Sequence, residues 1–191
     1  MLQGLRLTGL AACVAASPTL AQQGNITTDL ADVTIDLASG STLSILRDKG
    51  GCPPSCVQPM QAAPGIVTIG ELEVIEFLQE FSANGIGLLV DARLPDGFSQ
   101  GTLPGAVNVP ETTLAPENPY RDDLLEALGV RGDDFAGALD LVIFASGPDA
   151  PAAPSALRSL VGAGYPASKL RYYRGGVFAW SSLGLSTAVG Q

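Results

Sequence analysis

The segment LVIFASGPDAPAAPSALRSLVGAGY, residues 141–165, carries three structural signals in succession. Four apolar residues predict a buried strand, the small residues after them predict a tight loop, and residues 154–162 predict a helix with Pro154 in its first turn. In α/β proteins, anion sites and nucleophiles lie where a strand turns into a helix N-terminus. The loop therefore has the position of an active site. It consists of Ala145, Ser146, Gly147, Pro148, Asp149, Ala150, Pro151, Ala152 and Ala153.

The residues around this segment show the same alternation of strands and helices. Apolar runs predict strands at residues 67–69, 87–91, 106–109, 141–144 and 170–173. Amphipathic patterns predict helices at residues 70–83, around 124–128, and at 177–183. Such alternation predicts an α/β fold, in which helices cover both faces of a parallel sheet.

Sites in this fold class lie beyond the carboxyl ends of the strands. We therefore expect three segments at one edge of the sheet: Asp91 with Arg93, the loop that begins at Ala145, and Arg174 with the glycines after it.

The composition limits the classes of function. The chain has 191 residues, 46% hydrophobic and 15% charged, as in a folded protein with a substantial core. A net charge of -9 argues against binding to nucleic acid or to an anionic membrane surface, since both need clustered Lys and Arg. The chain has no histidine, which removes the usual general base and zinc ligand. An enzyme would need thiolate, carboxylate or backbone chemistry.

Residues 1–21 have the features of an export signal. Arg6 supplies the positive charge near the N-terminus, and residues 7–16 form an apolar run too short to span a membrane. Thr19-Leu20-Ala21 has the small-x-small pattern of a cleavage site. We expect cleavage after Ala21, a periplasmic or secreted protein, and no membrane span in the mature chain. A lipoprotein signal at Cys13 is a minor alternative, because the apolar region between Arg6 and Cys13 is short.

Residues 22–66 form an extension of different character, followed by the α/β domain at residues 67–187. Apolar residues alternate with polar ones on both sides of Ser39-Gly40, which predicts a β-hairpin. The stretch RDKGGCPPSCVQPMQAAPG, dense in glycine and proline, predicts a long loop.

This loop holds Cys52 and Cys56, the two cysteines left after cleavage. In an oxidising compartment a structural disulfide is the first interpretation. A redox-active or sulfur-carrying pair is the second, and a Cu(I) site that adds Met60 is the third. Two cysteines without histidine make a poor zinc site, and no cofactor is predicted.

Two stretches resemble the rhodanese domain. In LLVDARLPDGFSQGTLPGAVNVP, residues 88–110, a strand ends in Asp91-Ala92-Arg93, and a Pro-Gly-Ala turn and an Asn-containing strand follow. In GYPASKLRYYRGGVFAWSSLGLS, residues 164–186, the matching residues are Arg174, Gly175, Gly176 and Trp180. The resemblance covers about residues 67–187 and implies the rhodanese-like α/β fold, with Trp180 in the core. The Cys-Pro-Pro-Ser-Cys extension is similar to that of exported bacterial members.

The resemblance also implies where sulfur transfer would take place. In catalytic rhodaneses, a cysteine after the apolar strand takes sulfane sulfur from a donor such as thiosulfate and passes it on as a persulfide. Aligning Phe144 and Gly147-Pro148 puts Ala145 at the position of that cysteine and Ala150 at a second loop position. Neither alanine carries sulfur.

Other residues of the loop weaken such a site further. Ser146 has no histidine to take its proton, and Asp149 would repel an anionic donor. Pro148 and Pro151 lack an N–H, and Ala153 stands where a capping serine is expected.

The sequence therefore predicts a degenerate sulfurtransferase site. The expected role is that of a binding or accessory module for an unidentified protein or a small sulfur-containing ligand. Sulfur-transfer or thiol-redox chemistry by Cys52 and Cys56 is one alternative, and periplasmic Cu(I) binding is another.

Overall fold

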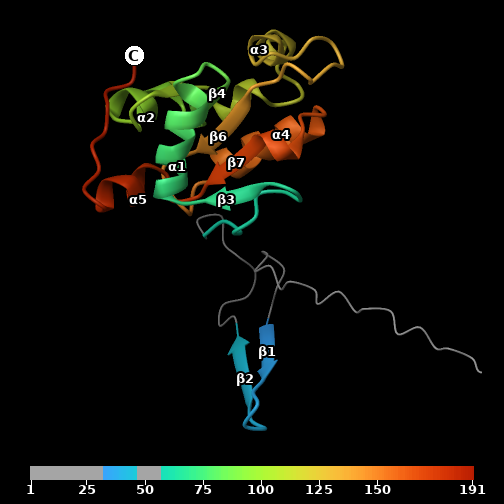
Figure 1. Cartoon of the computed structure of the whole chain (residues 1–191), viewed down its shortest axis with the longest axis vertical. Helices are drawn as coiled ribbons and strands as arrows, with labels where there is room; N and C mark the ends of the chain where they lie inside the picture. Colours follow the sequence, from blue (N-terminus) through green and yellow to red (C-terminus); the bar gives the residue numbers. More distant parts are fainter. Residues whose placement is uncertain (1–31, 47–56) are drawn as a thin grey trace, which may run out of the picture.

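A five-stranded parallel sheet forms the centre of the computed structural model, which describes residues 32–46 and 57–191 (Figure 1). Every pair of neighbouring strands is parallel, and the order is β3-β7-β6-β4-β5. The strands are β3 (Val67–Ile69), β4 (Gly87–Asp91), β5 (Ala106–Asn108), β6 (Asp140–Phe144) and β7 (Leu170–Tyr173). The predicted α/β fold is confirmed.

Helices cover both faces of this sheet, as Figure 1 shows for α1, α5 and α4. Their bounds are α1 (Glu71–Phe77), α2 (Pro95–Gln100), α3 (Arg121–Ala127), α4 (Ala152–Gly162) and α5 (Gly176–Ser182). Two single-turn 3-10 helices, η2 (Glu111–Thr113) and η3 (Ala167–Lys169), lie in the connections.

Strand β6 shows why the sheet needs two layers of helices. Successive side chains of a strand point to opposite faces. Phe144 therefore packs with Phe77 of α1 and Trp180 of α5, whereas Ile143 packs with Leu157 of α4. A strand buried on both faces reads as a continuous apolar run, which is how β6 appears in the sequence.

Two helices differ from their predicted bounds. The predicted helix at residues 70–83 is α1 followed by the π-helical segment η1 (Leu78–Ser82), in which Ala83 N–H bonds to the carbonyl of Leu78. Helix α4 begins at Ala152, before Pro154, because the first turn of a helix tolerates a residue without an N–H. The N-cap of α4 is Pro151, so the prediction of Ala153 as the capping position was wrong.

Helix α2 was not predicted. It is short, and Phe98 is its single buried residue, so it has no apolar periodicity. Pro95 fixes its first turn.

A two-stranded antiparallel hairpin stands in the extension, as predicted. Strand β1 (Asp32–Asp36) pairs with β2 (Thr42–Leu46), and Gly40 adopts a φ of +82° in the turn. The predicted signal and both cysteines of the Cys-Pro-Pro-Ser-Cys stretch lie outside the described residues.

Candidate functional site

The loop after β6 lies at the carboxyl edge of the sheet, together with the ends of β4 and β7. Ala92 N–H donates to the carbonyl of Phe144 at 2.9 Å, which joins the ends of β4 and β6. Val177 and Phe178 of α5 donate their N–H groups to the carbonyls of Ala145 at 3.1 Å and Ser146 at 2.8 Å. The N-terminus of α5 therefore holds the start of the loop.

Gly176 makes this close contact possible. Its φ is +60°, and a Cβ atom there would lie 2.3 Å from the carbonyl oxygen of Ala145. Only glycine combines this conformation with that space. The glycine pair of the family motif thus supports the backbone of the loop.

The side chains of the loop offer little chemistry. Ala145 is 3% exposed, so its methyl group is part of the core. Ser146 and Asp149 are exposed, and Ala150 is half-buried. The loop is closed by a hydrogen bond from Ala150 N–H to the carbonyl of Gly147, 3.1 Å long. It presents methyl groups, backbone, the hydroxyl group of Ser146 and the carboxylate of Asp149.

Residues 57–66 of the extension, here called the docking segment, reach this loop. Gln58 N–H donates to the carbonyl of Pro148 at 2.6 Å. The carbonyl of Gln58 accepts two hydrogen bonds from Arg174, from Nε at 3.0 Å and from Nη2 at 2.7 Å. Ala62 and Ile66 are buried in the core and anchor the segment.

Arg174 also contacts Met60, since its Nη1 lies 3.1 Å from the Sδ atom. A guanidinium this close to the thioether opposes a cation there, which disfavours Met60 as a copper ligand. Over residues 32–46 and 57–191, no group of three or more His, Cys, Asp or Glu side chains could hold a metal ion. No helix in these two ranges is long and apolar enough to cross a membrane.

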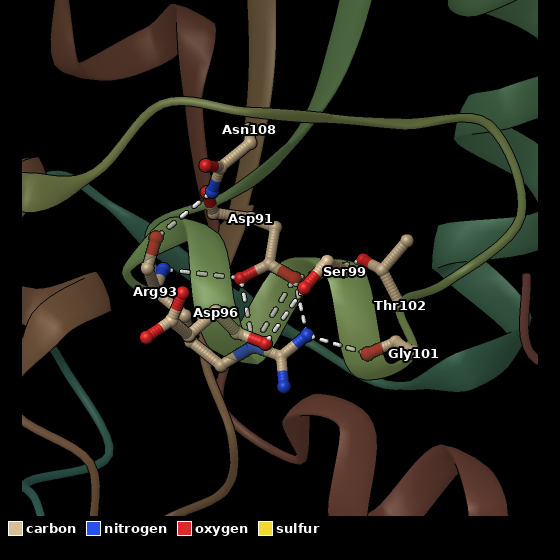
Figure 2. Close-up of polar contacts among 7 residues, drawn as sticks. All are labelled: Asp91, Arg93, Asp96, Ser99, Gly101, Thr102 and Asn108. Carbon is tan, nitrogen blue, oxygen red and sulfur yellow. Dashed lines mark hydrogen bonds and ion pairs between the residues drawn. The ribbon is translucent and has the colours of Figure 1, made fainter. Parts of the chain in front are cut away.

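Asp91 and Arg93 form a buried polar network, shown in Figure 2. The carboxylate of Asp91 is fully buried and accepts hydrogen bonds from Arg93 N at 3.0 Å, Arg93 Nε at 2.9 Å and Arg93 Nη2 at 2.6 Å. Thr102 Oγ1 donates to the same carboxylate at 2.8 Å.

The network ties the end of β4 to the segments around it. Arg93 Nη2 donates to the carbonyl of Gly101 at 2.7 Å, and Asn108 Nδ2 donates to the carbonyls of Asp91 and Arg93 at 3.0 and 2.8 Å (Figure 2). The protein itself supplies several donors to the Asp91 carboxylate. We therefore assign this network to the scaffold.

Trp180 and the tyrosines of β7 are likewise structural. Trp180 packs in the core, and its Nε1 donates to the carbonyl of Ser186 at 2.8 Å. Burial raises the pKa of Tyr173, and the hydrogen bond from its hydroxyl to Glu71 raises it further. Burial also raises the pKa of Tyr172, to about 12. Both phenols stay protonated at neutral pH and do not act as bases.

The rhodanese-like domain model matches residues 73–183, and this range contains the Asp91 network, the loop and the glycine pair. The chain belongs to the rhodanese-like family. The match covers more than half of the chain and confirms the resemblance seen in the sequence at the level of the family.

Solved structures are similar to this chain. A protein from Bacillus halodurans aligns with a TM-score of 0.50 and 13% identity, over 64% of this chain and 76% of that chain. A thiosulfate sulfurtransferase from Pseudomonas aeruginosa gives 0.46 and 20% identity, over 69% and 22% of the two chains. The rhodanese-like domain of an Anabaena protein gives 0.43 and 18%, over 68% and 81%.

At 13% identity, the similarity to the Bacillus halodurans structure supports the fold alone. No relative was found among the curated proteins.

The sequence motifs identified the loop, the Asp91 network and the glycine pair, which the structure brings to one edge of the sheet. The contacts of the docking segment were not predicted. Its contacts are made by the backbone of Gln58 and by a side chain far along the chain, so no periodic pattern marks it. The Gly-Pro-rich stretch at residues 47–65, which contains most of the docking segment, was the one available signal.

Proposed function

We propose that this rhodanese-like protein is an exported binding or accessory module without thiosulfate sulfurtransferase activity. The main observation behind this proposal is the alanine at position 145. It directly follows β6, at the position that the resemblance gives to the sulfur-carrying cysteine. A methyl group forms neither a thiolate nor a persulfide, so the step that defines the reaction has no acceptor.

No neighbouring group replaces the thiol. Ser146 is exposed, and the chain has no histidine to activate its hydroxyl. The exposed carboxylate of Asp149 repels an anionic sulfur donor. Gln58 already bonds to the carbonyl of Pro148, so the extension lies against the loop where a donor would approach.

The activity assay is direct. Purified protein is incubated with thiosulfate and cyanide, and thiocyanate is measured beside an active rhodanese. We expect no thiocyanate above the protein-free control. Robust turnover that disappears in Ser146→Ala would contradict the proposal, because it would show that the loop supplies its own nucleophile.

Export is the second part of this proposal. It is supported by the charge, apolar run and small residues of residues 1–21. The mass of the protein recovered from the extracytoplasmic fraction tests it. Loss of residues 1–21 is expected, whereas a lipid on Cys13 or an intact Met1 would contradict cleavage after Ala21.

A second candidate function is sulfur transfer or thiol-redox chemistry by the extension. The observation that favours it is the hydrogen bond between Gln58 and Pro148, because Cys56 precedes Gln58 by two positions in the sequence. A thiol carried by the extension would replace the one missing from Ala145.

Serine variants of the two cysteines separate the candidates. If the extension carries sulfur, a cysteine thiolate of the reduced protein attacks the sulfane sulfur of thiosulfate, the S–S bond of thiosulfate breaks, and sulfite leaves. The wild-type protein then gains the mass of a sulfur atom, and Cys52→Ser or Cys56→Ser abolishes that gain. Ser55→Ala, between the two cysteines, is the matched control and retains it. No gain in the wild-type protein contradicts sulfur transfer by the extension and leaves the non-catalytic proposal standing.

A further inference from the structure

A pocket of about 330 Å³ lies between the beginning of α3 and one face of α4. None of its residues belongs to the loop after β6 or to the docking segment. The lining carries two guanidinium groups and two hydroxyl groups and no carboxylate. The residues are Pro116, Arg121, Ser155, Arg158, Ser159 and Gly162.

Arg121 is held in place beside the pocket. Its Nη2 donates to the carbonyl of Ser159 at 3.0 Å, which fixes the guanidinium against α4. Its Nε is buried and has no acceptor among the described residues. This buried atom is out of reach of a ligand oxygen, so Arg121 contributes to the pocket through its positive charge and its other N–H groups.

Arg158 supplies a second, uncommitted charge. It is exposed on α4, and within residues 32–46 and 57–191 it makes no ion pair or hydrogen bond. On α4, Arg158 and Ser159 follow Ser155 by three and four residues, and each of these spacings places a side chain on the same helix face as Ser155. Their donors can therefore converge on the space beside Arg121.

The charge of this pocket differs from that of the whole chain. The chain has a net charge of -9, with 10 basic and 19 acidic residues, yet two of those basic residues line this pocket and no acidic residue does. Guanidinium groups match the oxygens of phosphate and sulfate in geometry, and serine hydroxyls add neutral donors.

We propose that this pocket binds the phosphate or sulfate group of a small organic monoester. The two arginines would neutralise a doubly charged tetrahedral oxyanion, and the hydroxyl groups of Ser155 and Ser159 would add donors to it. The volume is within the range of small-molecule pockets, so an organic substituent has room beside the oxyanion. This site is separate from the degenerate loop and independent of the proposed function.

Calorimetric titration tests the site with inorganic phosphate, inorganic sulfate and O-phosphoserine as probes. Arg158→Gln should weaken the binding of each probe about tenfold, because it removes a charged donor from an exposed position that the fold does not need. Arg131→Gln is the matched control. Arg131 is an exposed arginine that faces Glu126 and does not line this pocket, so its loss should leave affinity unchanged.

Two outcomes overturn the proposal. Equal affinity of Arg158→Gln and the wild type for the probes would show that the pocket does not bind the anion. Equal affinity of O-phosphoserine and inorganic phosphate would overturn the monoester as ligand and assign the site to the free ion. Tighter binding of O-phosphoserine, weakened by Arg158→Gln, supports the proposal.

Discussion

The backbone amide of Gln58 donates a 2.6 Å hydrogen bond to the carbonyl of Pro148. The carbonyl of the same residue accepts two hydrogen bonds from Arg174. Both polar groups of the Gln58 backbone are therefore used, one by the loop after β6 and one by the residue after β7. The extension beyond Val57 is thus an integral part of the surroundings of the loop.

Arg174→Gln should release the docking segment. The variant loses two charge-assisted hydrogen bonds to Gln58 and the contact with Met60, and bonds of this kind contribute about 1.5–3 kcal/mol each. We expect hydrogen exchange at the Gln58 amide to become at least about tenfold faster, since local opening becomes easier. Mass-spectrometric exchange on peptides that contain Gln58 measures this change.

Met60→Leu provides the graded comparison for that experiment. It removes the sulfur contact and leaves both hydrogen bonds to the Gln58 carbonyl, so a smaller effect is expected. Unchanged exchange in Arg174→Gln would mean that the docking segment is held by its buried residues Ala62 and Ile66 alone.

Gly176→Ala should destabilise the protein much more than Gly184→Ala. Both glycines have a positive φ, +60° and +77°, which costs about 1–2 kcal/mol for alanine. At Gly184 a Cβ meets no atom within 4 Å, whereas at Gly176 it would lie 2.3 Å from the carbonyl of Ala145. We expect a total loss of more than about 3 kcal/mol for Gly176→Ala. Urea denaturation measures the free energy of unfolding of both variants. Equal losses of stability would show that the loop moves away from the added methyl group at no cost in free energy.

Asp91→Ala should be among the most destabilising substitutions of the chain. It leaves the guanidinium of Arg93 without the carboxylate that accepts three of its hydrogen bonds, and removal of one partner of a buried ion pair costs about 3–5 kcal/mol. Glu126→Ala is the control, because both members of its ion pair with Arg131 are exposed and the expected loss is below about 1 kcal/mol. Similar unfolding midpoints of the two variants would exclude a scaffold role for Asp91.

The strands could be predicted from the sequence because a buried strand appears as a local run of apolar residues. Strand β6 is buried on both faces and therefore appears as an uninterrupted apolar run. Strand β3 has three residues and was predicted from its short apolar run, Val67-Thr68-Ile69. Helix α2 has no such pattern, since Phe98 is its single buried residue.

The parts of the site that depend on tertiary contacts could not be predicted in this way. Gln58 bonds to the loop through its backbone, which leaves no mark in the choice of side chain. Arg121 and Arg158 come from different helices, and only the packing of α4 against the start of α3 makes them neighbours. The polar network of Asp91 was easier to anticipate, because Asp91 and Arg93 are two positions apart and share a turn.

The buried hydroxyl of Tyr172 predicts an effect of pH on stability. Burial raises the pKa of Tyr172 from its ordinary value of 10 to about 12, although Arg174 and Arg158 act in the opposite direction. The folded state therefore holds the phenol proton more tightly than the unfolded state. The resulting stabilisation is complete below pH 10 and is lost as the pH rises from 10 through 12.

Tyr172→Phe should reduce this alkaline loss of stability. The hydroxyl has no hydrogen-bond partner among the described residues, so at neutral pH its removal should leave stability unchanged or raise it by about 1 kcal/mol. Between neutral pH and about pH 11, the free energy of unfolding should fall less in the variant than in the wild type. Tyr120→Phe is the control, since Tyr120 is 69% exposed and should leave the pH profile unchanged. Urea denaturation at both pH values measures the difference, and identical slopes for Tyr172→Phe and the wild type would contradict the shifted pKa.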